Sequence, residues 1–210
     1  KVRLTGIRSG GGCALRPLLH LHFLAILNPF ALCLYLAAVM EDLNSRDFFR
    51  VFFLSSLISL LVFWLFVITG NALLVQVLKV RPSALRVFGG IIFFAVGYNY
   101  ATKGYRATAS LRGSLDELPS AIALPYMIGA ATITQSIIMG DAHGSYAGML
   151  IIFAGVLISF GLVIGFKFFR DKMNGPRERV FDRYVNIFSR INGLITVSYT
   201  HLRAHETSLH

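Results

Sequence analysis

Charged residues are scarce in this chain. Only 14% of its 210 residues are Asp, Glu, Lys or Arg, whereas about one quarter of a soluble domain is charged. Hydrophobic residues make up 55%, and the mean hydropathy is +0.66. A water-soluble fold of this composition would expose large apolar patches. The sequence therefore excludes an ordinary soluble domain and predicts a polytopic membrane protein.

Cysteine and catalytic motifs are scarce as well. The two cysteines, Cys13 and Cys33, have no metal-ligand spacing around them, which excludes a disulfide framework and a zinc site. The chain contains no H-E-x-x-H, no G-x-S-x-G and no Walker glycine loop. We therefore expect no catalytic residue, no metal site, no cofactor and no enzyme activity.

The net charge of +10 arises from twenty Lys and Arg against ten Asp and Glu. These basic residues are scattered between apolar runs, as in the loops of membrane proteins, so we expect the lipid bilayer and no nucleic acid as a partner. The loops after the first, third and fifth apolar runs hold most of the cations, which places those loops in the cytoplasm. The N-terminus is then predicted outside.

A helix needs about 20 apolar residues to cross a bilayer. Five runs meet this requirement, and a sixth begins around residues 184–190 and stops before it could cross. The predicted fold is an all-α bundle of transmembrane helices with a truncated sixth helix. The five predicted spans are residues 21–40, 51–74, 84–100, 119–139 and 145–166.

The two ends of the chain differ from its middle. Residues 1–19 form a basic, glycine-rich stretch without periodicity, which we expect to be disordered or a non-native extension. Residues 197–207 (VSYTHLRAHET) resemble a translated sequencing adapter, so residues 197–210 are interpreted as an artefactual tail. The membrane domain is predicted to cover residues 20–196.

Two short patterns recur in register. LNPF at 27–30 interrupts the first span and ALPY at 123–126 the fourth, whereas RVFGGI at 86–91 opens the third span and RINGLI at 190–195 the sixth. Units of three spans enter the membrane in opposite orientation, as in secondary transporters whose interrupted helices form the binding site. The predicted inverted repeats cover about residues 20–102 and 117–196.

The interruptions have a chemical consequence. A proline removes a backbone donor and ends the preceding helix, and a new half-helix presents free N–H groups that suit an anion. We expect Asn28 and nearby carbonyls to hold a cation or ammonium group, and Thr132 and Thr134 to help bind a carboxylate. The predicted substrate-binding residues are Asn28, Pro29, Pro125, Gly129, Thr132, Thr134 and Gln135.

The alternative is structural. Asn28 and Pro29 would then only kink a helix, and the hydroxyls between Thr132 and Ser136 would bond their own backbone. Tyr100 and Tyr126 need no role beyond packing. No Asp or Glu lies inside a span, so a proton relay is less favoured than sodium coupling or simple facilitation.

Several of these segments resemble the MarC family of multipass inner-membrane proteins. The resemblance rests on Asn28-Pro29, GNALL at 70–74, ALRVFGGII at 84–92, LPYMIGAATI at 124–133 and RINGLI at 190–195. It implies six spans. Two departures are CLY at 33–35, where the family usually has a second proline, and GAA at 129–131, where it usually has Gly-Pro-Gly.

The resemblance implies a bacterial inner-membrane location, and some members resemble transporters of small neutral amino acids. Together with the paired interruptions, it predicts a secondary transporter of small amino acids or related metabolites that works by alternating access. The alternative is a non-transporting membrane assembly or stress-response component. The oligomeric state and the substrate stay open.

Overall fold

The computed structural model describes residues 23–70, 72–77, 79, 82–104, 106–107, 115–173 and 176–207. Within these residues the chain is 91% helical and has no strand, which confirms the all-α prediction. The extension predicted at residues 1–19 lies outside the described part of the chain.

Among the described residues, two helices are long and apolar enough to cross a bilayer by themselves: α4 (Ser45–Thr69) and α8 (Ser145–Asp171). With 25 and 27 residues they measure about 40 Å, since each residue adds about 1.5 Å, and so exceed a hydrocarbon core of about 30 Å. They pack side by side, with the rings of Phe52 and Phe160 stacked 5.5 Å apart. They correspond to the second and fifth predicted spans.

The fourth predicted span is a bent helix. It consists of α6 (Leu118–Ile122), a π-helical turn η3 (Ala123–Met127) and α7 (Ala130–His143). The two arms differ in direction by 73°, and together they are long and apolar enough for a third crossing. The interruption predicted around Pro125 and Gly129 is therefore confirmed, and the Leu124–Pro125 peptide bond is cis.

The first predicted span is interrupted as well. Residues 23–27 are helical, Asn28 leaves the helix, and α2 (Pro29–Tyr35) and α3 (Ala37–Asp42) follow. Asn28 has a φ of 45°, in the left-handed region that Asn tolerates better than most residues. The apolar stretch Phe23–Tyr35 is too short to cross a bilayer by itself.

The sixth helix begins earlier than predicted. Helix α9 (Pro176–Thr207) has 32 residues and continues through residues 197–207. It is not among the helices of the described residues that are long and apolar enough to cross a bilayer, as the prediction of a truncated sixth span expected. The earlier start was missed because residues 176–183 are mostly polar, whereas the sequence count required a continuous hydrophobic run.

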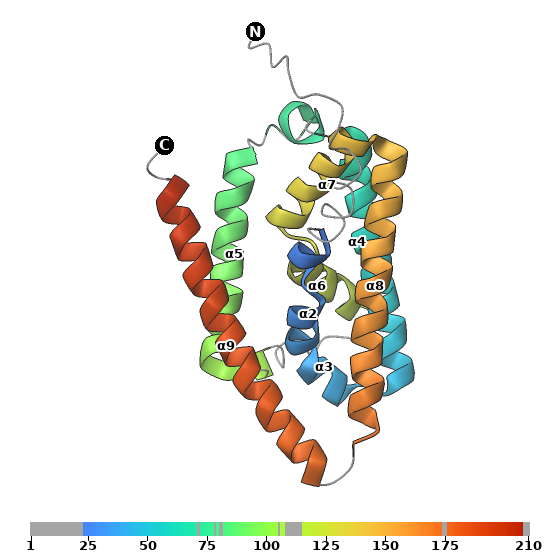
Figure 1. The fold of residues 1–210 in the computed structure, drawn as a ribbon, viewed down its shortest axis with the longest axis vertical. Coiled ribbons are helices and arrows are strands. Elements are labelled where there is room, and N and C mark those ends of the chain that lie inside the picture. Colours follow the sequence, from blue (N-terminus) through green and yellow to red (C-terminus); the bar gives the residue numbers. More distant parts are fainter. Residues whose placement is uncertain are drawn as a thin grey trace, which may run out of the picture.

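Helix α9 packs along α5 (Pro82–Lys103), the third predicted span. A short π-helical segment, η1 (Leu73–Val77), precedes α5. Figure 1 shows α2, α3 and α6 in the middle of the molecule, with α4 and α8 on one side and α5 and α9 on the other. The interrupted helices are thus enclosed by the long ones, and Leu36, Phe63 and Met127 are buried in the core between them.

Candidate functional site

The two interruptions face one buried core. Leu27 and Leu32 flank the first break, Met127 and Ile128 border the second, and all four belong to the same hydrophobic cluster. Helix α2 also contacts η3 directly. The sequence predicted that the interrupted helices would meet, and the structure brings them together in the middle of the bundle (Figure 1).

The first break is closed by its own residues. The Asn28 side chain accepts a hydrogen bond of 3.1 Å from the backbone N–H of Ala31 and so caps α2. Pro29 occupies the first turn, where its missing N–H costs nothing. Asn28 is exposed and Pro29 half-buried, so the amide group of Asn28 stays within reach of a ligand.

The second break is organised by Thr132. Its hydroxyl accepts from the Gly129 N–H at 2.9 Å and lies within hydrogen-bonding distance of the carbonyls of Met127 (3.1 Å) and Gly129 (2.9 Å). The Thr134 and Ser136 hydroxyls bond the carbonyls four residues earlier, at 2.8 Å each. Thr134 and Ser136 therefore bond their own helix backbone, as the structural alternative in the sequence analysis expected.

The remaining predicted residues differ in environment. Pro125 and Gly129 are half-buried, and a Cβ on Gly129 would lie 2.8 Å from the ring of Phe93, so α5 covers this break closely. Gln135 is only 5% exposed and has no hydrogen bond within the described residues. No hydrogen bond there joins Asn28 to Thr132 or Thr134, so the two breaks share a core but not a direct polar contact.

A tyrosine cluster lies between the breaks, and sequence analysis missed it. The ring of Tyr35 on α2 lies 4.5 Å from that of Tyr100 on α5 and 5.5 Å from that of Tyr126 on η3. The Tyr100 hydroxyl donates to the Tyr35 carbonyl at 2.8 Å, and Asn192 on α9 donates to the Tyr35 hydroxyl at 2.9 Å. Thr196 lies 3.4 Å from the same hydroxyl. The cluster thus ties four segments together.

We expect Tyr35→Phe to lower the free energy of unfolding by about 1 kcal/mol, because hydrogen bonds between membrane helices contribute about this much. That corresponds to about 2–4 °C in the unfolding temperature, measured on detergent-purified protein. Tyr146→Phe is the matched control, since Tyr146 is 77% exposed. Equal unfolding temperatures of the two variants would contradict a stabilising role of the cluster.

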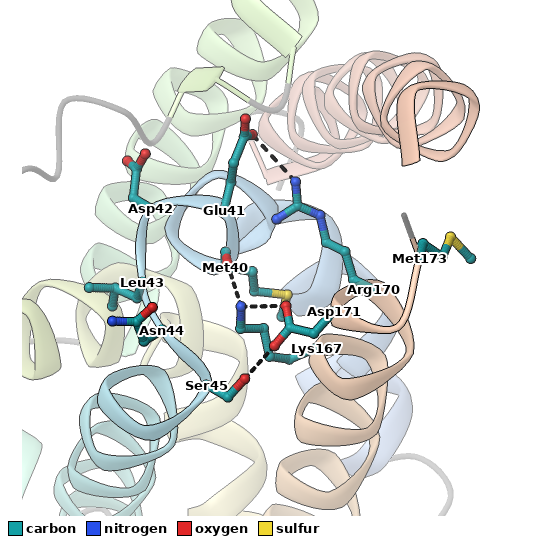
Figure 2. A pocket seen from close by; sticks show the side chains of 10 residues that line it. All are labelled: Met40, Glu41, Asp42, Leu43, Asn44, Ser45, Lys167, Arg170, Asp171 and Met173. Atoms are coloured by element: carbon teal, nitrogen blue, oxygen red, sulfur yellow. Dashed lines mark hydrogen bonds and ion pairs between the residues drawn. The ribbon is translucent and has the colours of Figure 1, made fainter. Parts of the chain in front are cut away.

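A second polar site lies at one end of the bundle, at the corner between α3 and α4. It is a pocket of about 440 Å³, and Figure 2 shows the side chains that converge on it. The Lys167 ammonium group donates to the Met40 carbonyl and to the Asp171 carboxylate, both at 2.7 Å. Ser45 at the start of α4 donates to the other oxygen of Asp171. The pocket is lined by Met40, Glu41, Asp42, Leu43, Asn44, Ser45, Lys167, Arg170, Asp171 and Met173.

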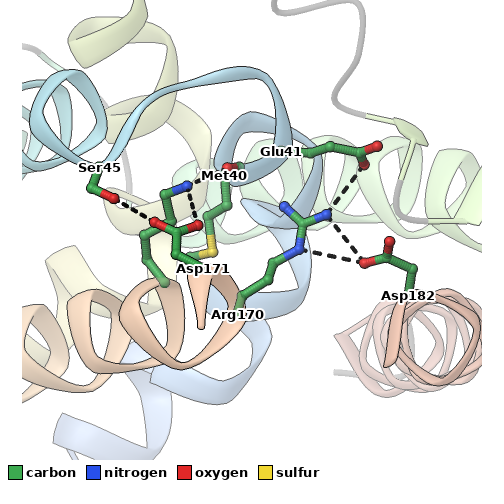
Figure 3. A network of polar contacts seen from close by, with 7 residues as sticks. Met40, Glu41, Ser45, Arg170, Asp171 and Asp182 are labelled. Atoms are coloured by element: carbon green, nitrogen blue, oxygen red, sulfur yellow. Dashed lines mark hydrogen bonds and ion pairs between the residues drawn. The ribbon is translucent and has the colours of Figure 1, made fainter. Parts of the chain in front are cut away.

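Arg170 completes this ionic cluster. Its guanidinium group lies 3.1 Å from Asp182 on α9 and 3.5 Å from Glu41 on α3 (Figure 3). Lys167 and Arg170 are 5% and 6% exposed, although the sequence assigned both to a cytoplasmic loop. Buried cations are retained where anions compensate them, and here Asp171, Asp182 and Glu41 do so.

A family model for MarC family integral membrane proteins matches residues 17–200. The chain belongs to the MarC family. The description of the family as integral membrane proteins fits the apolar helices α4 and α8.

Two relatives extend this finding. The MarC chain is 25% identical over 140 residues to a UPF0056 membrane protein of Pyrococcus horikoshii, a match that covers 66% of this chain and 67% of the relative. It is 23% identical over 188 residues to a UPF0056 membrane protein of Aquifex aeolicus, with 85% of both chains covered. No solved structure matches the chain.

The two departures from the MarC pattern fall at the breaks. Where a second proline is expected, α2 continues through Cys33 to the buried Tyr35, which forms the tyrosine cluster. Ala130 opens α7, and a Cβ on Gly89 of α5 would lie only 2.5 Å from the Cβ of Ala130. This MarC protein thus places a tyrosine and a close α5–α7 contact at its two interruptions.

Proposed function

We propose that this MarC protein is a secondary transporter of small amino acids or related small metabolites. The proposal rests on one observation, the meeting of two interrupted helices in the middle of a membrane bundle. Interrupted helices in lipid leave backbone groups that neighbouring protein, water or a ligand must satisfy. Protein groups satisfy several of them here, while Asn28 stays exposed.

The pairing of the helices supports an inverted repeat. The second and fifth spans pack together as α4 and α8, the third and sixth as α5 and α9, and the first and fourth meet through α2 and η3. Within each long pair the helices run in opposite directions (Figure 1). A two-fold axis in the membrane plane would produce this arrangement, which is the basis of alternating access in many transporters.

The geometry refines which groups would contact a substrate. We propose that the exposed Asn28 amide binds the ammonium group, or a sodium ion, together with carbonyls of the first break. The substrate carboxylate would compete for the Thr132 hydroxyl and the N–H groups at the start of α7, which the helix dipole makes electropositive. Gln135, buried without a partner in the described residues, supplies a further donor.

Uptake by proteoliposomes tests the transport function. We expect saturable uptake of labelled alanine, glycine or serine by the wild-type chain, measured with and without a sodium gradient. Asn28→Leu and Thr132→Val are expected to reduce the initial rate at least tenfold, since losing hydrogen bonds to charged groups costs about 1.5–3 kcal/mol. Thr132→Ser, which keeps the hydroxyl, is expected to retain uptake.

The controls are taken from α5. Asn99→Leu and Thr102→Val remove an amide and a hydroxyl whose hydrogen bonds go only to carbonyls of their own helix, so both should transport like wild type. Absence of uptake by a correctly folded wild-type chain would contradict transport of these substrates and favour the non-transporting assembly. If the α5 controls lose as much uptake as Asn28→Leu and Thr132→Val, the substrate site does not lie specifically at the breaks.

We also propose an inner-membrane location with the α3–α4 and α8–α9 corners in the cytoplasm. Both corners lie at the same end of the molecule (Figure 1), as the loop charges require. Arg46 and Arg50 at the start of α4, together with Lys172 after α8, place positive charge at that end, where the positive-inside rule predicts it.

A further inference from the structure

The ionic cluster joins the two proposed repeat units at one end of the bundle. Three of its contacts cross between the units: Lys167 to the Met40 carbonyl, Ser45 to Asp171, and Arg170 to Glu41. The first unit contributes the α3–α4 corner and the second contributes the end of α8. Asp182 on α9 also belongs to the second unit and holds Arg170 from the other side.

The cluster differs from a permanently buried joint, because its anions reach water. The side chains of Glu41, Asp171 and Asp182 are 44%, 32% and 25% exposed, whereas those of Lys167 and Arg170 are 6% and 7% exposed. Separating such pairs is less costly than separating pairs buried on both sides, since the carboxylates rehydrate as they part. The adjoining pocket of about 440 Å³ gives water a place to enter.

The cluster lies directly over the buried core. Met40 lines the pocket, yet its side chain is fully buried and belongs to the same core as Leu36 and Leu27. Leu27 precedes the break at Asn28, so the core behind the cluster extends to that break. Figure 3 shows Arg170 between Glu41 and Asp182, so the ion pairs connect the ends of α3, α8 and α9.

We infer that the ionic cluster of Glu41, Ser45, Lys167, Arg170, Asp171 and Asp182 is a gate, which closes one end of the pathway between the repeat units and must part for the pathway to open there. The gate rests on the proposed transport function. It assigns a conformational role to residues that neither touch the breaks nor form part of the predicted binding site.

Thiol labelling of a buried reporter tests the gate without any substrate. Met40→Cys is introduced into a chain carrying Cys13→Ser and Cys33→Ala, and its reaction with a hydrophilic maleimide is followed in detergent or nanodiscs. We expect Arg170→Met to raise the labelling rate about tenfold, because losing a coupling of about 1.4 kcal/mol shifts a two-state equilibrium by that factor. Glu41→Gln, which removes one of the three contacts between the units, should raise it about threefold.

Matched controls separate gate opening from unfolding. Met139→Cys is an equally buried reporter on α7, a helix that lies toward the other end of the molecule in Figure 1, and its labelling rate should not change with Arg170→Met. Arg183→Met removes an exposed cation next to Asp182 and should leave the Met40→Cys rate unchanged. Arg170→Lys, which keeps the charge, should give a rate close to wild type.

Two results would overturn the gate. One is an unchanged Met40→Cys rate in both Arg170→Met and Glu41→Gln, and the other is an equal rise at the Met139→Cys reporter, which indicates general loosening. The transport function is tested separately by wild-type uptake. If the wild-type chain transports but the variants label at the wild-type rate, the protein is a transporter and the gate is wrong. If the variants label faster but the wild-type chain does not transport, the transport function is wrong, and the ion pairs still close this end of the bundle.

Discussion

Gly193→Ala is expected to lower the free energy of unfolding by about 2–3 kcal/mol, because it overpacks the contact between α5 and α9. A Cβ at Gly193 would lie 2.6 Å from the Ala101 nitrogen and 2.7 Å from the Gly97 carbonyl oxygen. Both atoms belong to the backbone, so no side chain can rotate away and the helices themselves must move apart. Small residues permit such close approaches between membrane helices.

The separation should also reach the tyrosine cluster. Asn192 precedes Gly193 on α9 and donates to the Tyr35 hydroxyl, so a displaced α9 stretches or breaks that hydrogen bond. We expect the unfolding temperature to fall by about 5–10 °C, measured on purified protein by intrinsic fluorescence or differential scanning calorimetry. The double variant Tyr35→Phe/Gly193→Ala should lose less free energy of unfolding than the two single variants lose in sum, because both act on the same hydrogen bond.

Two glycines of α8 provide the matched control. A Cβ on Gly161 or Gly165 would meet no atom within 4 Å, and alanine favours the helical conformation over glycine by about 1 kcal/mol. Gly161→Ala and Gly165→Ala are therefore expected to leave stability unchanged or raise it. A Gly193→Ala variant as stable as these two would show that the α5–α9 contact tolerates a methyl group and contradict the packing argument.

The sequence was sufficient to locate the interruptions. Asn28-Pro29 ends a helix for a local reason, the missing proline N–H and the restricted residue before it, and the structure shows the break there. Pro125 and Gly129 act in the same way in the fourth span. The long spans α4 and α8 were predictable because a continuous apolar run is enough to form a membrane-spanning helix, whatever distant residues pack against it.

The polar contacts were not predictable from local pattern. Tyr35 and Asn192 are separated by 157 residues and Lys167 and Met40 by 127, and one sequence does not reveal which distant residues meet. Loop charge counting treated Lys167 as exposed because it considers cations without their partners. The early start of helix α9 was missed for a related reason, since its first residues are mostly polar and the helix packs on α5, a distant segment of the chain.

Lys167→Met is expected to have the other large effect, a loss of about 3 kcal/mol in the free energy of unfolding, because the buried ammonium group makes two hydrogen bonds and each bond to a charged group contributes about 1.5–3 kcal/mol. The ammonium group holds both the Met40 carbonyl and Asp171. Methionine fills a similar volume without replacing either hydrogen bond. We expect the unfolding temperature to fall by about 10 °C, whereas Lys172→Met, at an exposed cation in the same helix end, should change it little.

The pair with Asp171 can be separated from the bond to Met40 by a double variant. Asp171→Asn in the Lys167→Met background removes the uncompensated carboxylate, so it should recover part of the lost stability. The part that is not recovered sets an upper limit on the contribution of the bond between Lys167 and the Met40 carbonyl, which crosses between the proposed repeat units. Full recovery would show that this crossing bond contributes no stability, and the link between the α3–α4 corner and α8 would then depend on Arg170 and Ser45 alone.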